Sequence, residues 1–252
     1  MIKTRLIARI DVKNEFAIKG IHLEGLRKVG DPNALAVKYY QQGIDELIFM
    51  DAVAAYYDRN TLHSVIEAAC KNVFVPITVG GGIRTIEDIH RALTCGADKV
   101  AINTQAVRNP SFVTDASKTY GAQCIVGSLD AKQTAPNQWE AYIDNGREPT
   151  GIDAVEWAIK LQQMGVGELL ITSIDKEGTK KGFDIDLIDA LAPHIDVPYI
   201  ICGGAGNLEH FPHLFTQHTP SGVAAASIFH YDLSSALAIK QSIKHYVEVR
   251  DD

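Results

Sequence analysis

Short apolar segments alternate with longer amphipathic segments along the chain, and the alternation repeats eight times. The short segments are typical of buried strands and the longer ones of helices. The predicted strands are Arg5–Asp11, Glu46–Asp51, Val75–Val79, Lys99–Asn103, Gln123–Asp130, Glu168–Ser173, Pro198–Cys202 and Gly222–Ala226. The predicted helices are Pro32–Gly43, Arg59–Asn72, Thr85–Cys95, Pro110–Tyr120, Gly151–Gly165, Ile185–Pro193, Leu208–Gln217 and Asp232–Val249. Strict alternation implies a parallel sheet, and eight units predict an α/β fold, a closed (β/α)8 TIM barrel.

Residues at the predicted helix ends fit these boundaries. Asp31 and Asn109 each precede a proline, so we expect their side chains to cap the helices that begin at Pro32 and Pro110. Two loops are longer than the rest. We expect Gln133–Pro149 to form a small hairpin, and the first loop, Lys13–Gly30, to act as a flexible lid.

The two halves of the chain resemble each other. Ile10–Lys13 matches Leu129–Lys132, the pair Gly81-Gly82 matches Gly203-Gly204, and the offset between matching landmarks stays between 119 and 123 residues. A constant offset indicates an internal repeat. We therefore expect one barrel domain, residues 1–252, built from two half-barrels of four units. Such a barrel suits a ligand with two similar ends.

Composition and charge narrow the function. The chain has 252 residues, 46% of them apolar and 22% charged, and its formal net charge is −7. The acidic balance argues against binding of duplex nucleic acid, which needs a basic surface. A local basic pocket for a small phosphorylated ligand remains compatible with it.

The four cysteines and the N-terminal segment bear on the compartment. Cys70, Cys95, Cys124 and Cys202 are far apart in sequence, so they suggest neither a zinc site nor a disulfide framework. The first residues lack the apolar stretch of a signal peptide, and no segment is long and apolar enough for a membrane helix. We expect a cytoplasmic protein with no membrane contact.

Two aspartates are the candidate catalytic residues. Asp11 and Asp130 each end a predicted strand, and the carboxyl ends of barrel strands are where active sites lie. The half-repeat places them on opposite sides of the same opening. In a partly buried site one carboxyl group can be protonated and the other ionised, which suits general acid/base catalysis. Each aspartate alone would also suit the capping of a turn.

Glycine-rich turns follow two of the strands at matching positions. The first candidate cradle for a phosphate consists of Gly82, Asn103 and Thr104, and the second of Gly203, Gly204 and Ser227. Glycine lets backbone N–H groups approach an anion, and a helix N-terminus favours negative charge. A tight turn that needs positive φ is the structural alternative for each glycine pair.

Four charged residues mark the beginnings of strands, at the opposite end of the barrel. They are Arg5, Glu46, Lys99 and Glu168. Two bases and two acids at this level predict a salt-bridged ring that closes the barrel bottom. Because side chains alternate along a strand, Arg5 and Arg9 should face the lumen together with Asp11.

Two further candidates for the functional site have a less specific sequence pattern. Lys19 in the first loop can reach a phosphate or carboxylate, or remain solvated, and Asp175–Thr179 can close over a substrate or simply turn the chain. The sequence contains no P-loop, dinucleotide fingerprint or nucleophile–histidine arrangement. We therefore expect no cofactor and no metal.

The chain resembles the cyclase subunits of imidazole glycerol phosphate synthase over essentially its whole length, including the candidate residues above. The matching motifs are IDVKN, IKGIHLEGLRKVGDP, GIDELIFMD, VPITVGGGIR, GADKVAINT, LDAK, GELLITSIDKEGT and CGGAGNLEHF. The resemblance implies a lyase of histidine biosynthesis that needs no cofactor. It uses ammonia from a glutaminase partner to convert a bisphosphorylated ribulosyl formimino carboxamide ribonucleotide into imidazole glycerol phosphate and an aminoimidazole carboxamide ribonucleotide.

The resemblance also implies roles for individual residues. It makes Asp11 and Asp130 the catalytic pair, Lys19 a lid lysine, and the two glycine-rich turns the phosphate sites. It makes the ring of Arg5, Glu46, Lys99 and Glu168 a gate for ammonia on the partner-binding face.

Three positions depart from the family pattern. Arg9 stands where a small residue is usual, Gly25 where asparagine is usual, and Glu177 where aspartate is usual. In the lumen, Arg9 would either narrow the ammonia path or lower the pKa of Asp11. The departures keep two alternatives open. One is a paralogue that uses ammonia to amidinate a nucleotide-linked surface sugar, and the other is an idle scaffold for a glutaminase.

Overall fold

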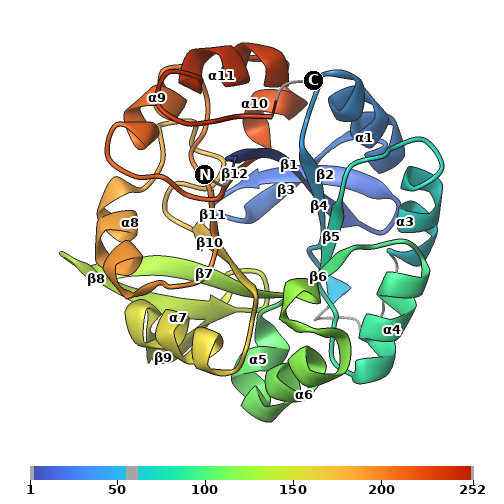
Figure 1. Cartoon of the computed structure of the whole chain (residues 1–252), viewed down its shortest axis with the longest axis vertical. Coiled ribbons are helices and arrows are strands. Elements are labelled where there is room, and N and C mark those ends of the chain that lie inside the picture. The colour runs from blue at the N-terminus through green and yellow to red at the C-terminus, as the bar shows by residue number, and fades with distance from the viewer. Residues whose placement is uncertain (1–2, 55–61, 251–252) are drawn as a thin grey trace.

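Eight parallel strands close into a barrel in the computed structural model, which describes residues 3–54 and 62–250 (Figure 1). In these ranges the barrel strands are β1 (Arg5–Lys13), β4 (Glu46–Asp51), β5 (Ile77–Gly80), β6 (Lys99–Ile102), β7 (Ile125–Ala135), β10 (Glu168–Ser173), β11 (Tyr199–Cys202) and β12 (Gly222–Ala225). β1 pairs with β12, β7 pairs with β10, and the ring is complete. The prediction of a (β/α)8 TIM barrel is confirmed.

Helices surround the barrel on the outside (Figure 1). The longer ones are α1 (Pro32–Gln41), α3 (His63–Ala69), α4 (Ile86–Thr94), α6 (Pro110–Tyr120), α7 (Ala154–Gln163), α8 (Ile185–Leu191), α9 (His210–Phe215) and α11 (Ala236–Ile243). Residues 59–61 of the predicted helix Arg59–Asn72 lie outside the described residues. Two short helices, α5 (Thr104–Arg108) and α10 (Ser227–His230), follow β6 and β12 and were not predicted.

The helix caps follow the sequence in one case and not in the other. The Asp31 carboxylate accepts a hydrogen bond from the backbone N–H of Ala34 at 2.8 Å, as predicted. The prediction for Asn109 is wrong, because its side-chain oxygen accepts a hydrogen bond from the hydroxyl of Ser111 and caps no backbone N–H.

Each half of the barrel begins with a strand that continues into an antiparallel hairpin. β1 pairs with β2 (Phe16–Ile21), which pairs with β3 (Glu24–Gly30). In the second half, β7 pairs with β8 (Gln138–Ile143) and β8 with β9 (Glu148–Asp153). The predicted hairpin in Gln133–Pro149 is therefore confirmed, but it runs longer. β9 extends over Glu148–Asp153, so the helix predicted from Gly151 begins only at Ala154, with Asp153 as its cap.

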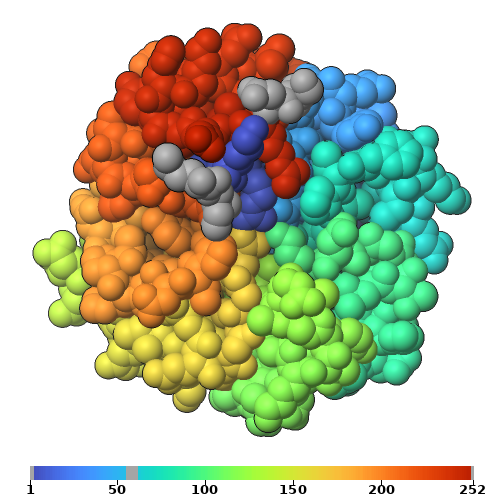
Figure 2. Space-filling view, in the orientation of Figure 1, coloured from blue at the N-terminus to red at the C-terminus, as the bar shows by residue number. Residues whose placement is uncertain are grey.

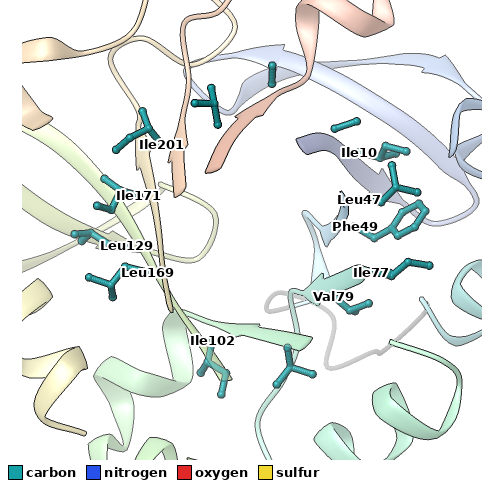
Figure 3. Close-up of a cluster of buried hydrophobic side chains, with 14 of the residues drawn as sticks. Ile10, Leu47, Phe49, Ile77, Val79, Ile102, Leu129, Leu169, Ile171 and Ile201 are labelled. Carbon is teal, nitrogen blue, oxygen red and sulfur yellow. The ribbon is translucent and has the colours of Figure 1, made fainter. Parts of the chain in front are cut away.

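The main core lies between the barrel and its helices. Figure 3 shows side chains such as Ile10, Phe49 and Leu169 on the outer side of the strands, where they are fully buried. A second cluster fills the lumen, and its members come from alternate positions of the same strands. The lumen cluster consists of Ile7, Ile48, Ala101, Val126, Leu170, Ile200, Cys202 and Ala224. The barrel is thus a packed core rather than an open pore.

Both described ends of the chain lie on one face, the one at which the strands begin. Figure 2 views this face and shows the dark blue start of the chain beside the red segments of its end. The backbone N–H of Thr4 donates to the carbonyl of Glu248 at 2.8 Å. Within the described residues no helix is long and apolar enough to cross a membrane.

Candidate active site

The two aspartates lie at the carboxyl ends of opposite barrel strands. Asp11 belongs to β1 and Asp130 to β7, which stand four strands apart in either direction around the ring. Their exposed fractions are 4% and 5%. A buried carboxyl group is either paired with a cation or protonated, so the neighbours decide the chemistry of each.

Asp11 lies between two cations. Its Oδ1 atom accepts a hydrogen bond from Nε of Arg9 at 2.8 Å, and Nζ of Lys19 lies 3.9 Å from Oδ2. Burial by itself raises the pKa of Asp11, but the charges of Arg9 and Lys19 outweigh burial and hold the pKa below its usual value. Asp11 is therefore an ionised carboxylate at neutral pH.

For Asp130 the effects that raise the pKa outweigh those that lower it. Burial raises its pKa, and the charge of Asp11 adds to this effect. The charge of Arg9 and hydrogen bonds from Asn103 and Thr172 lower the pKa but do not compensate, so it stays above its usual value. Two carboxyl groups in one opening thus have pKa values that are pushed apart, an arrangement typical of an acid/base pair.

The guanidinium of Arg9 lies in the lumen directly below Asp11. Arg9 is 1% exposed, and the predicted inward orientation of Arg5 and Arg9 is confirmed. Besides Asp11, Arg9 donates from Nη1 to the hydroxyl of Thr172 at 3.0 Å and to the sulfur of Cys202 at 3.7 Å. Thr172 in turn hydrogen-bonds Asp130. A chain of polar contacts therefore connects the two aspartates through Arg9 and Thr172.

The structure brings the three residues of the first cradle into one pocket. Gly82, Asn103 and Thr104 line it together with Asp130. Gly82 has a φ of 73°, and Asn103 and Thr104 begin α5. Three arginines contribute to the rim: Arg84, Arg108 and Arg147. Glycine backbone, a hydroxyl group and guanidinium groups suit a phosphate.

A buried carboxylate, Asp144, also lines this pocket and has no counterpart in the sequence-based expectations. It occupies the turn between β8 and β9, where its φ is 51°. Its Oδ1 accepts from the hydroxyl of Thr104 at 3.3 Å, and its Oδ2 lies 2.9 Å from Nη2 of Arg108. The Asp-Asn-Gly run at 144–146, typical of a tight turn, signals the turn but not its packing against the first cradle.

The second cradle is only partly assembled around one pocket. Ser227 is the first residue of α10 and lines a pocket with Lys19, Gly20, Gly178 and Tyr231. Gly203 and Gly204 are not in this lining. Both have φ above 100°, and a side chain on Gly204 would collide with the carbonyl oxygen of Gly182. The positive φ at both positions, together with the close approach of a neighbouring carbonyl oxygen to each, accounts for glycine there.

The hairpin β2–β3 covers the opening and brings Lys19 inside. Lys19 is 3% exposed and forms an ion pair with Glu177 as well as its contact with Asp11. The backbone N–H of His22 donates to the carbonyl of Glu177 at 2.8 Å, which fixes the hairpin to the loop after β10. Burial, together with the charge of Arg9, lowers the pKa of Lys19 despite the opposing charge of Asp11. We call β2–β3 the lid hairpin.

A histidine near the second cradle was not singled out by the sequence. His230 ends α10, and its Nδ1 is hydrogen-bonded to the Tyr39 hydroxyl at 2.7 Å. Burial and the charge of Lys19 lower its pKa to about 4, so the ring is neutral at pH 7. His230 reaches this site because it lies in the unpredicted short helix α10, and a single histidine in an apolar run does not predict such a position.

The four charged residues at the barrel bottom form the closed ring of ion pairs that was predicted. Arg5 contacts Glu46 at 2.5 Å and also contacts Glu168. Lys99 lies 2.7 Å from Glu46 and 2.8 Å from Glu168. Each charge has two opposite neighbours, so the ring is neutral overall and its charges are compensated.

No group of three or more His, Cys, Asp or Glu side chains is placed to hold a metal ion in residues 3–54 and 62–250.

The family model and the relatives that match this chain all carry names from histidine biosynthesis or from one synthase subunit. The family model described as "Histidine biosynthesis protein" matches residues 5–234. A Legionella pneumophila protein named imidazole glycerol phosphate synthase subunit HisF is 53% identical over 211 residues, which are 84% of this chain and all of that protein. A Streptococcus mutans protein of the same name is 43% identical over 251 residues, 99% of this chain and all of that protein.

Proposed function

Because the chain belongs to the histidine biosynthesis protein family, we propose that it is the cyclase subunit of imidazole glycerol phosphate synthase. Its substrate is then the ribulosyl formimino carboxamide ribonucleotide with two phosphates, and its products are imidazole glycerol phosphate and aminoimidazole carboxamide ribonucleotide. The observation that carries the proposal is the pair Asp11 and Asp130, buried at the same opening with pKa values shifted in opposite directions.

The shifts assign a role to each aspartate. Addition of ammonia to a substrate carbonyl requires that the nitrogen lose a proton and that the oxygen gain one. Asp11, held ionised by Arg9 and Lys19, is the group that accepts the proton. Asp130, whose pKa is raised, is the group that donates one. The two aspartates regain their starting protonation states when a proton moves from Asp11 to Asp130, directly or through solvent.

The substrate's two phosphates fit the two cradles. The first cradle offers the Gly82 turn, Asn103 and the Thr104 hydroxyl, with arginines at its rim. The second offers Ser227 at a helix start, with Lys19 in the same pocket. Since the cradles belong to equivalent positions of the two half-barrels, a substrate with a phosphate at each end would span the opening and place its centre between the aspartates.

Ammonia would enter from the opposite end of the barrel. Its source in this proposal is a glutaminase partner bound over the ring of Arg5, Glu46, Lys99 and Glu168, with which it forms a heterodimer. The relatives are named as subunits of a synthase, which supports a partner of this kind. A neutral ring of ion pairs can exchange partners locally without leaving a charge uncompensated, as the passage of a small neutral molecule requires.

The decisive experiment measures turnover of the ribulosyl formimino substrate by the purified chain with an ammonium salt as nitrogen source. We expect product formation, and we expect Asp11→Asn and Asp130→Asn each to reduce kcat by about 10²- to 10⁴-fold. Asp115→Asn, an exposed aspartate on α6, is the matched control and should retain activity.

The outcomes separate the hypotheses. Absence of turnover at high ammonia concentration would refute the proposed function, and activity on a nucleotide-linked sugar instead would favour the amidinating alternative. Turnover that persists in both asparagine variants would refute the acid/base assignment while leaving the reaction in place. An idle scaffold would turn over neither substrate.

A further inference from the structure

The Arg9 guanidinium is the least exposed of the charged groups around the opening. Its Nε and Nη1 atoms have hydrogen-bond partners on three strands: Asp11 on β1, Thr172 on β10 and Cys202 on β11. Arg9 is thus anchored to the barrel wall at three points. A buried arginine remains charged because its pKa is far above neutral, and the Asp11 charge raises that pKa further against the effect of burial.

Several charged or titratable groups act on Asp11, and they come from different elements. Arg9 lies on its own strand, Lys19 on the lid hairpin, Asp130 on β7 and His230 on α10, while Cys202 on β11 faces Arg9. Among these groups Arg9 and Lys19 are the cations, since His230 is neutral at pH 7.

The two cations differ in how firmly they are held. Lys19 lies 3.9 Å from Asp11, is shared with Glu177, and belongs to a hairpin that is fixed to the loop after β10 by the His22–Glu177 backbone hydrogen bond. Arg9 donates to Asp11 at 2.8 Å from inside the lumen, below the site that the substrate would occupy. A displacement of the lid hairpin would remove Lys19, which lies on β2, and would leave Arg9, which lies on β1, in place.

We propose that Arg9 is a positioning residue, which fixes the Asp11 carboxylate through Nε and keeps it ionised whether the lid hairpin is open or closed. The proposal rests on the proposed function in one respect, because it takes Asp11 as the group that accepts a proton. Its contact with Thr172, which hydrogen-bonds Asp130, extends the same fixed frame to the second aspartate. Arg9 acts through these carboxyl groups and needs no contact with substrate.

The primary test is a ¹³C NMR titration of the Asp11 carboxyl carbon in the full chain, without substrate. Removal of an adjacent opposite charge raises the titration midpoint of a carboxyl group by about 1–3 pH units. We expect such a rise in Arg9→Met. Lys19→Met should give a smaller rise, and Lys28→Met, an exposed lysine of the same hairpin, none.

Two further variants keep the test valid if Arg9→Met does not fold. Arg9→Lys retains the charge and should keep the midpoint near that of the wild type. Thr172→Val removes one anchor but not the charge, so it should shift the Asp11 midpoint by less than half a pH unit, an order-of-magnitude expectation from the weakness of one lost neutral contact. If the Asp11 midpoint rose in Arg9→Lys by as much as we expect for Arg9→Met, the proposal would be contradicted, because the charge is still present in Arg9→Lys.

Kinetics supply the second readout. In Arg9→Met the acidic limb of the pH profile of kcat should move upward by the same amount as the NMR midpoint, with KM changed less than threefold, roughly, because no substrate contact is lost. An Asp11 midpoint unchanged in folded Arg9→Met would overturn the proposal whatever the chain catalyses. Absence of turnover in the wild type would instead overturn the proposed function and leave the NMR result unaffected.

Discussion

The side-chain nitrogen of Asn103 lies 2.9 Å from Oδ2 of Asp130, so a residue of the first cradle also holds the second aspartate. The same nitrogen donates to the carbonyl of Tyr142 at the end of β8. In the proposed function, phosphate binding at the first cradle and protonation of Asp130 therefore involve one side chain. This connection between binding and proton transfer makes Asn103 an informative position.

Asn103→Ala should move the alkaline limb of the pH profile of kcat to higher pH. The hydrogen bond from Asn103 favours the charged form of Asp130, so its loss raises a pKa that is already above the usual value. Activity requires protonated Asp130 and falls as pH rises through that pKa. A hydrogen bond to a charged group contributes about 1.5–3 kcal/mol, so the limb should move by about 1–2 pH units.

Asn109→Ala, at an exposed position beyond α5, is the control and should leave the profile unchanged. A shift of the limb toward lower pH in Asn103→Ala would show that Asp130 is not the acid.

Thr104→Val and Ser227→Ala should each raise KM for the bisphosphorylated substrate about 10- to 100-fold, with a smaller effect on kcat. Each variant removes one hydroxyl that we assign to a phosphate, and the loss of such a contact weakens ground state and transition state alike. Steady-state kinetics at saturating ammonia measure this. Ser111→Ala, on the surface of α6, should match the wild type. Equal KM values in all three variants would show that the hydroxyls of Thr104 and Ser227 do not contact the phosphates.

Lys19→Met should loosen the lid hairpin. The substitution leaves Glu177 without its ion-pair partner, although the backbone hydrogen bond between His22 and Glu177 remains. Hydrogen exchange of the β2 and β3 amides should accelerate by about tenfold or more, since loss of a buried charge partner costs several kcal/mol. Lys28→Met, whose ammonium lies over the Phe16 ring on the same hairpin, is the matched control. Unchanged exchange in Lys19→Met would mean that the backbone contacts alone hold the hairpin.

His230→Gln should weaken the pH dependence of stability on the acidic side. The folded-state pKa of His230 is lowered to about 4, so folding favours the neutral ring, and the associated stability is complete above pH 6.5. It is lost as pH falls from 6.5 toward 4. The difference in unfolding free energy between wild type and variant should change by about 3 kcal/mol across this interval, from urea denaturation at several pH values. A constant difference would place the ring in an environment open to solvent.

Glu46→Gln should reduce glutamine-dependent turnover more than ammonia-dependent turnover. Glu46 contacts both Arg5 and Lys99, and its neutralisation leaves a net positive ring at the barrel bottom. In the proposed function, ammonia added from solution reaches the opening directly, whereas ammonia from the partner passes the ring. The measurement compares the two nitrogen sources in the complex, with Glu87→Gln on α4 as an exposed control. An equal loss with both sources would exclude a gating role.

The repeat of strands and helices was predictable because each unit carries its own periodicity. β4 and β10 begin and end at the predicted residues, since each starts at a glutamate and continues as an apolar run up to a polar end. Gly151–Asp153 was assigned to a helix, because the sequence does not show that these residues pair with β8. The short helices α5 and α10 were missed because four or five residues are too few to show a helical period.

The places of the candidate residues in the fold were predictable where the half-repeat duplicates them. Asp11 and Asp130, the glycine turns and the charged ring all lie at positions that strand ends determine. Asp144 and His230 could be identified only from the structure, because the turn that holds Asp144 and the short helix that holds His230 fold back over the opening. The pairing of Arg9 with Thr172 joins residues 163 positions apart, and alternation along β1 predicts the direction of Arg9 but not its partners.

The pairing of β1 with β12 has a consequence for the order of the chain. Arg5 lies opposite Gly222 in that ladder, and Thr4 meets Glu248 on the same face. The junction between the first and last strands is therefore hydrogen-bonded like any other junction of the ring. The barrel has no structurally first strand, and a circularly permuted chain, with its ends joined and a new start between the half-barrels, would contain the same ladder of neighbours.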